Sequence, residues 1–280
     1  MKTFDLNRFG KTFRWIFAVR LQWLIGWTAG YAVIVFLGEL LWWFFNKGSE
    51  TSLIVTNVAG FFMIFIYIAL GIGLTMLFYD ENKKQKREAL LMLPASNLEK
   101  YLSAFIYYTV IWGAAVFVSF ICGDTLRMIV RALFWGDEWI SAIPQVLDNM
   151  SPKMVSGSVV ATTKFYVMTI LLYVSFLVWL NSLYILGGTL LRKFSFVITS
   201  IVFLLSVALL GWVLNHTEMT MFNYEWTGQY YAAKEVGAIP YILCVLLPLL
   251  SVFNYWASFQ IFKGFQLITN KWTNYDILKR

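Results

Sequence analysis

Six long apolar blocks, in which Glu39 is the sole charged residue, account for more than half of this sequence. An α-helix needs about 20 apolar residues to cross a hydrocarbon core of about 30 Å. We therefore predict an all-α integral membrane protein with six transmembrane helices in a single transmembrane domain, residues 1–280. The expected spans are Trp23–Phe45, Leu53–Tyr79, Tyr101–Gly123, Phe165–Leu191, Phe194–Asn215 and Val236–Phe262.

The composition excludes an ordinary water-soluble domain. Hydrophobic residues make up 60% of the chain and charged residues 13%, whereas about 25% of the residues in soluble domains are charged. The formal net charge of +7 is explained by anionic lipid and by orientation during membrane insertion. We expect lipid as a partner and no binding of nucleic acid.

The distribution of basic residues predicts the orientation of the chain. An even number of spans places both termini on one side, and 16 of the 22 Lys and Arg residues fall on that side. Cytoplasmic loops carry the excess of Lys and Arg in membrane proteins. The termini, residues 80–100 and the tail 263–280 are therefore expected in the cytoplasm.

Two segments outside the spans have helical patterns. Residues 1–22 carry aromatic side chains on one side and basic ones on the other, which predicts an amphipathic helix along the inner leaflet; a plain basic tail is the alternative. Residues 124–164 are expected to form an external loop with short interfacial helices. Asp124 is predicted to cap the first of them, and the second is expected near Trp139–Leu147.

The sequence contains no recognisable catalytic or metal-binding motif. His216 is the sole histidine, and Cys122 and Cys244 have no metal-ligand spacing, although a bridge between them is left open. Gly10-Lys11-Thr12 resembles the end of a phosphate-binding loop, but Asp5 stands where that loop requires its first glycine. We expect no cofactor, metal or nucleotide to bind to this chain.

A few residues in the spans are candidates for a pathway or a dimer contact. A charge within a membrane span calls for a functional hypothesis, and Glu39 either lines a pathway or reaches lipid headgroups. Gly26 and Gly30 allow close helix approach, either between protomers or within one. Asn57, Asn181 and Asn254 either line a cavity or form hydrogen bonds between helices.

The cytoplasmic loop 80–100 has the most informative local pattern. A charged run leads into an apolar helical turn that Pro94 ends. Ser96 and Glu99 then have the spacing of a capping box, which starts the third span. The loop is predicted to contain a short surface helix joined rigidly to a membrane helix.

The run Arg87-Glu-Ala-Leu-Leu-Met-Leu-Pro-Ala-Ser-Asn-Leu-Glu-Lys-Tyr-Leu resembles the segment after the second span in permease subunits of ABC-2-type ABC transporters. A pattern similar to L-x-x-L-P-[VA]-S-[RN]-x-E recurs there, and the six spans with an amphipathic N-terminal helix are also similar. This chain departs from the family in having its long outer loop between spans three and four. In the family this segment is a coupling helix, and the resemblance assigns that role to Arg87, Glu88, Leu90, Leu91, Leu93, Pro94, Ser96 and Glu99.

The resemblance implies a permease in a bacterial inner membrane, which dimerises with itself or with a sibling chain. Cytoplasmic ABC ATPase subunits would bind ATP and Mg²⁺ and hydrolyse the ATP, so this chain would not itself be an enzyme. Because its spans offer aromatic and apolar walls, we expect export of an amphipathic substrate such as a lipid, peptide or drug. The alternatives are an intramembrane enzyme acting on lipid or protein, and a membrane scaffold or sensor subunit that transports nothing.

Overall fold

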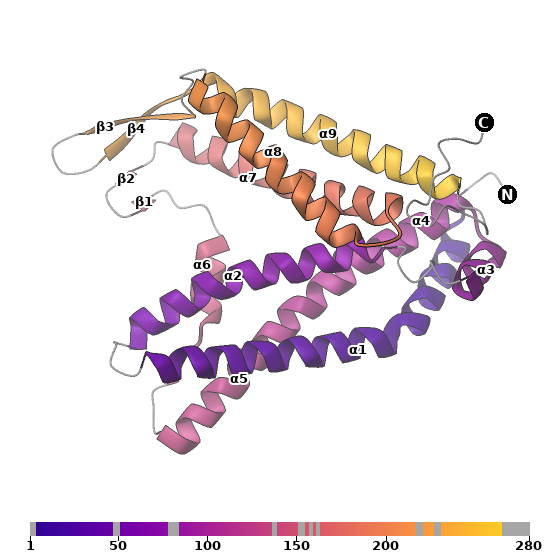
Figure 1. Ribbon diagram of the computed structural model, residues 1–280, viewed down its shortest axis with the longest axis horizontal. Helices are drawn as coiled ribbons and strands as arrows, with labels where there is room; N and C mark the ends of the chain where they lie inside the picture. The colour runs from indigo at the N-terminus through magenta and orange to yellow at the C-terminus, as the bar shows by residue number, and fades with distance from the viewer. Residues whose placement is uncertain are drawn as a thin grey trace. The chain divides into compact units, whose positions relative to one another are not determined.

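The computed structural model of the chain (Figure 1) describes most of its 280 residues. These are residues 4–46, 51–77, 84–135, 139–150, 155–156, 159–160, 163–216, 221–226 and 231–264. Within them, six helices are long and apolar enough to cross a membrane. This confirms a multi-pass membrane protein whose spans are helical.

The contacts within the chain divide it into two compact units. The first contains Met1–Leu77 and Glu88–Ser151, and the second contains Phe78–Arg87 and Pro152–Arg280. The helix α3 (Lys84–Met92) crosses the boundary between them. The other elements of the first unit are α1 (Leu6–Phe45), α2 (Thr51–Thr75), α4 (Asn97–Ile106), a π-helical segment (Tyr107–Ile111), α5 (Trp112–Trp135) and α6 (Ile143–Met150).

The amphipathic N-terminal segment and the first span form one continuous helix, α1, of 40 residues. Asp5 begins it, because the Asp5 carboxylate accepts hydrogen bonds from the backbone N–H groups of Asn7 and Arg8. At 1.5 Å per residue such a helix is about 60 Å long, which is about twice the thickness of a hydrocarbon core. Part of α1 therefore extends beyond the apolar layer.

The third span is longer than predicted, because α4, the π-helical segment and α5 follow one another without a break from Asn97 to Trp135. The prediction that Asp124 caps a separate outer helix is wrong, since Asp124 lies inside α5. Its carboxylate instead accepts a hydrogen bond from the backbone N–H of Ala142, just before α6. The helix α6 begins at Ile143, four residues after the start predicted at Trp139. Pro144 lies in the first turn of α6, where proline is tolerated.

In the first unit, α1 and α5 pack closely against each other (Figure 1). Gly123 on α5 makes this possible, because a Cβ there would lie 2.7 Å from Val35 Cγ1 and 2.8 Å from the backbone oxygen of Ala32. The largest fully buried side chains of the unit include Phe62, Tyr107, Tyr108 and Phe120. Aromatic rings thus fill much of the core around α5.

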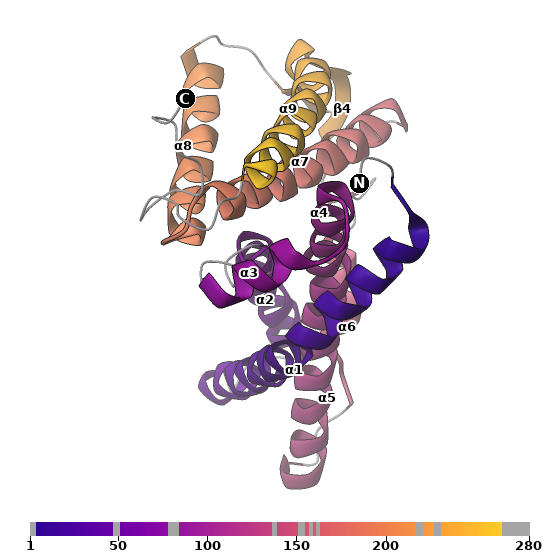
Figure 2. The same ribbon diagram turned by 90° about the vertical axis from the view of Figure 1, so that its right-hand side faces the viewer.

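The second unit contains three long helices, α7 (Thr163–Leu190), α8 (Ser195–His216) and α9 (Ala238–Lys263). The helices α7 and α9 lie side by side (Figure 2). Gly187 on α7 allows α8 to approach, since a Cβ there would lie 1.9 Å from Thr199 Oγ1. Between α7 and α8 the chain turns within four residues, with Phe194 at a φ of 53°.

A small sheet in the second unit was not predicted. Its strands occur in the order β1-β2-β4-β3, and the neighbours β2 and β4 are parallel while the other two pairs are antiparallel. The sheet joins the segment before α7 to the segment between α8 and α9. The strands are β1 (Val155–Ser156), β2 (Val159–Val160), β3 (Phe222–Trp226) and β4 (Tyr231–Val236).

Candidate functional site

The loop between α3 and α4 is held by a capping box at the start of α4. Ser96 Oγ accepts a hydrogen bond from the backbone N–H of Glu99 at 3.3 Å. In return, the backbone N–H of Ser96 donates to Glu99 Oε2 at 2.8 Å. This reciprocal pair confirms the predicted capping box and satisfies two backbone N–H groups where the loop meets α4.

The other carboxylate oxygen of Glu99 binds the beginning of α1. The backbone N–H of Asp5 donates to Glu99 Oε1 at 2.8 Å, and Arg8 Nη2 donates to the same oxygen at 3.0 Å. Glu99 is fully buried, so these charge-assisted hydrogen bonds replace the water that the carboxylate loses. One side chain therefore ties the loop to the N-terminal helix.

A second buried charge closes the loop on itself. Lys100 Nζ donates a hydrogen bond to the backbone oxygen of Leu91 at 2.9 Å, in the last turn of α3. A cation is favourable there, because the final carbonyl groups of a helix have no partner within the helix. Lys100 thus holds the C-terminal end of α3 against the start of α4.

The predicted coupling residues divide into buried and exposed groups. Leu90 and Glu99 are buried, Pro94 is exposed, and the others whose side chains are described are partly exposed; the Arg87 side chain lies outside the described part of the structure. Met92 is 84% exposed and was missed. It lies two positions after Leu90, about 200° around the helix, so helical spacing alone identifies it as the residue facing outward.

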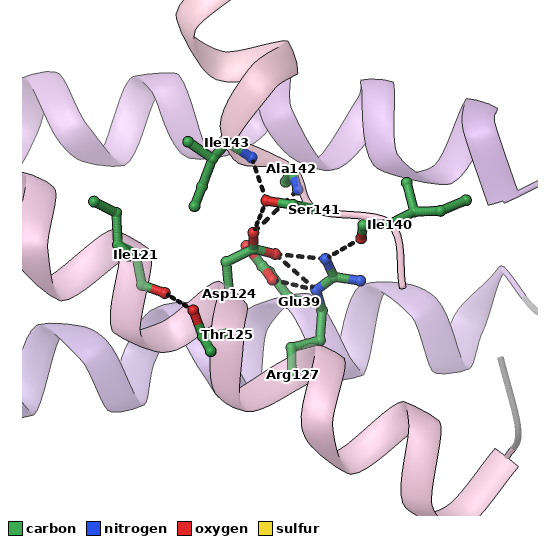
Figure 3. A network of polar contacts seen from close by, with 9 residues as sticks. All are labelled: Glu39, Ile121, Asp124, Thr125, Arg127, Ile140, Ser141, Ala142 and Ile143. Carbon is green, nitrogen blue, oxygen red and sulfur yellow. Dashed lines mark hydrogen bonds and ion pairs between the residues drawn. The ribbon is translucent and has the colours of Figure 1, made fainter. Parts of the chain in front are cut away.

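The helices α1, α5 and α6 meet at a buried ionic network (Figure 3). Glu39 Oε2 lies 2.6 Å from Arg127 Nε, and the Arg127 guanidinium also forms an ion pair with Asp124. Arg127 Nη2 donates a further hydrogen bond to the backbone oxygen of Ile140 at 2.8 Å. All three charged side chains are at least 95% buried.

The same network fixes the segment that leads into α6. The hydroxyl of Ser141 donates to Asp124 Oδ2, and the backbone N–H of Ala142 donates to the same oxygen (Figure 3). Ser141 Oγ in turn accepts from the N–H of Ile143. From the sequence Glu39 was a candidate, whereas Arg127 and Ser141 were not. Asp124 and Arg127 do have the i, i+3 spacing of a local ion pair. The contacts of Arg127 with Glu39 and of Ser141 with Asp124 join residues far apart in the sequence, so no local motif indicates them.

The candidate pathway residues in the second unit bridge neighbouring helices. Asn254 Nδ2 on α9 donates to Ser182 Oγ on α7 at 3.1 Å, and Tyr255 OH donates to Asn181 Oδ1 at 2.9 Å. Of the two roles considered for Asn181 and Asn254, this geometry supports hydrogen bonding between helices.

The remaining candidates lie at exposed positions. Asn57, Gly26 and Gly30 are exposed, and no heavy atom lies within 4 Å of a Cβ built at either glycine. Gly26 and Gly30 therefore allow no close helix approach within the described chain, and a dimer contact stays a prediction. Cys122 and Cys244 are both free thiols.

Comparison with family models, with curated proteins and with solved structures finds no significant match to this chain.

Proposed function

We propose that this chain is the membrane subunit of an ABC-2-type transporter and that a separate cytoplasmic subunit hydrolyses the ATP that drives transport. In this proposal both termini and the loop between α3 and α4 face the cytoplasm of a bacterial cell, and the chain works as a dimer. The observation that carries the proposal is the Glu99 carboxylate, which joins this loop to α1.

A coupling element must transmit a displacement without deforming. The α3–α4 loop meets this requirement, because Lys100 closes it internally and Glu99 ties it to both α4 and α1. A push on α3 would move two membrane helices together. Met92 and Pro94 on its exposed surface are the residues that would contact an ATPase subunit.

The surfaces of the membrane-spanning helices favour an amphipathic substrate. Their exposed side chains are mostly large and apolar. The buried Glu39 carboxylate is paired with Arg127, and the guanidinium groups of Arg20 and Arg131 lie against aromatic rings. An amphipathic molecule that enters from the lipid fits such walls better than a highly charged solute does.

The test is co-purification with a candidate ATPase subunit, chosen as a soluble chain that has a Walker A motif and whose gene neighbours the gene of this chain. We expect Met92→Asp to lower recovery of the ATPase subunit, and its stimulated ATP hydrolysis, at least tenfold. The fold should persist, because the Met92 side chain is almost fully exposed.

Leu147→Asp is the matched control. Leu147 is also exposed and apolar, but it lies on α6, which the proposed orientation places outside the cell. This variant should retain the ATPase. Full co-purification and stimulation with Met92→Asp, or no association of the wild-type chain with the ATPase, would contradict the proposal.

A further inference from the structure

A cavity of about 170 Å³ lies in the first unit, where α5 contacts both α1 and α2. Its floor is formed by α5, whose residues Trp112, Val116 and Ser119 line the cavity and are buried. Its rim includes Ile34 on α1 and Ile68 on α2, which are 55% and 42% exposed. The cavity therefore opens sideways between α1 and α2, towards the lipid that surrounds these helices.

The cavity is long and narrow. Its lining residues fall within residues 27–34 on α1, 65–72 on α2 and 112–119 on α5. Seven helical steps of 1.5 Å give it a length of about 10 Å. An apolar cavity of about 150 Å³ holds a single benzene molecule, so a similar volume drawn out over this length suits a slender chain better than a bulky ring system.

A cluster of three indole rings closes one end of the cavity. The ring of Trp112 stacks on Trp23 with the centroids 5.1 Å apart and meets Trp27 edge-on at 5.8 Å. Trp112 Nε1 also donates a hydrogen bond to the backbone oxygen of Ala69 at 2.9 Å. The indole lies against Gly73, where a Cβ would be 1.9 Å from Nε1. Because Trp112 is held on all these sides, a ligand enters from the side and not past this end.

The wall offers no hydrogen bond to a ligand. The hydroxyls of Thr28 and Ser119 each donate to a backbone oxygen four residues earlier, at 2.7 Å. The hydroxyl oxygen of Tyr31 has no accessible surface, so Tyr31 offers the cavity its ring alone. None of the described residues that line the cavity is charged. A polar ligand would lose its hydration here without compensation.

The cavity lies at the depth of the acyl chains of one leaflet. Residues 27–34 lie between the start and the middle of the predicted span Trp23–Phe45. The predicted span Leu53–Tyr79 runs in the opposite direction, and Ile68 and Ile72 lie in its second half. Both spans place the cavity in the half of the membrane nearer to the N-terminus. Half of the hydrocarbon core is about 15 Å thick, which is enough to enclose the cavity.

We propose that this cavity binds one acyl chain of a membrane lipid, which enters between α1 and α2 from the leaflet on the N-terminal side. Lipid tails are as apolar as the wall, so no hydrophobic driving force favours binding. The gain comes from dispersion contacts, because the atoms that line an empty apolar cavity lack neighbours on one side. No ATPase subunit takes part, so this site and the transport proposal succeed or fail separately.

Photocross-linking from the lipid tests the proposal. The purified full chain is placed in phosphatidylglycerol nanodiscs that contain a small fraction of phosphatidylglycerol with a diazirine in the middle of one straight acyl chain. After irradiation, mass spectrometry of peptides locates the cross-links. Val118 is the internal reference, because it is exposed on α5 and meets the surrounding lipid. Trp112 and Val116 are buried, so a chain reaches them only from within the cavity.

We expect cross-links at Trp112 and Val116 in the wild type. Ala115→Leu should lower them at least fivefold relative to Val118, because the larger side chain fills the cavity that Ala115 lines. Ala114→Leu is the matched control. It is the same change at the neighbouring residue, which is exposed and does not line the cavity, and it should leave the ratio unchanged.

A change of the bulk lipid provides a second measurement on the wild type. In nanodiscs made of lipid with methyl-branched phytanoyl chains, the bulk chains are too wide for the narrow cavity. The straight-chain probe should then be concentrated there. We expect the ratio of cross-links at Trp112 and Val116 to those at Val118 to rise at least twofold.

Three results would overturn the proposal. The first is the absence of cross-links at Trp112 and Val116 in the wild type, as expected if a second copy of the chain covers the opening. The second is equal cross-linking in the wild type and in Ala115→Leu, and the third is a loss in Ala114→Leu as large as that in Ala115→Leu. If Ala115→Leu does not fold, the phytanoyl comparison decides alone, and an unchanged ratio would overturn the proposal.

Discussion

Glu39 is the one charged residue of the apolar span Trp23–Phe45, and the structure shows how its charge is neutralised. A charge in a membrane span is unfavourable unless it is paired, and Arg127 on α5 supplies the partner at 2.6 Å. Neither of the two roles considered from the sequence, a pathway or a reach to lipid headgroups, included this ion pair. The network instead connects two membrane helices and the start of α6.

A double-mutant cycle measures this connection. Arg127→Met leaves two buried carboxylates without their guanidinium, and removal of one partner of a buried ion pair costs about 3–5 kcal/mol. Glu39→Met should also destabilise the chain. The double variant should lose less than the sum of the two, by about 0.5–3 kcal/mol, in free energies of unfolding from SDS titration in mixed micelles.

Ser141→Ala is the control at the edge of the same network. It removes one hydroxyl that donates to the buried Asp124 carboxylate, so we expect a loss of about 1.5–3 kcal/mol, as for a hydrogen bond to a charged group. Strict additivity of Glu39→Met and Arg127→Met would show that the two side chains do not act as a pair.

At the scale of whole helices, Gly123 determines how closely α1 and α5 pack. We expect Gly123→Ala to destabilise the chain by about 1–3 kcal/mol, as overpacking of a core does. The reason is that the added methyl group meets the α1 backbone at Ala32 and cannot be avoided by a rotamer change. The SDS titration used for the ionic network measures this loss.

Gly26→Ala provides a matched comparison on α1. Its Cβ would meet no atom within 4 Å, so the free energy of unfolding of the protomer should not fall. If Gly26→Ala lowered the free energy of unfolding as much as Gly123→Ala does, Gly26 would have to pack against another part of the protomer. That result would contradict the exposed position of Gly26 on α1.

The comparison of sequence with structure shows which elements a local pattern can predict. The six long helices were predictable because each depends on the composition of its own residues. The capping box was predictable because it spans four residues. The second role of Glu99 was not, since Asp5 lies 94 residues away in sequence. The sheet was not predictable either, because it requires segments from distant parts of the chain and its strands are two to six residues long.

At the scale of the whole molecule, orientation is the property on which the proposed function depends. The loop between α3 and α4 can meet an ATPase only on the cytoplasmic side. The count of 16 basic residues on one side against six on the other predicts that orientation. It can be tested without knowledge of any partner.

Cysteine labelling in intact cells measures the orientation directly. In a chain with Cys122→Ser and Cys244→Ser, we expect Asn82→Cys to react with a membrane-impermeant maleimide only after permeabilisation. Asn149→Cys is the control, because Asn149 is exposed on α6 and is predicted to lie outside. It should react in intact cells. The reverse pattern would contradict the proposed topology.

The π-helical segment Tyr107–Ile111 gives the third span one turn that is wider than an α turn and holds an extra residue. A chain that lost one residue here could close this turn as an ordinary α turn and keep the two ends of the run nearly in phase. Each residue turns an α-helix by about 100°, so a residue lost from α5 before Gly123 would instead rotate Gly123 relative to Glu99 by that angle. Both ends of the run contact α1, through Glu99 at one end and Gly123 at the other. The chain should therefore tolerate loss of a codon within Tyr107–Ile111 far better than loss of a codon elsewhere between Glu99 and Gly123.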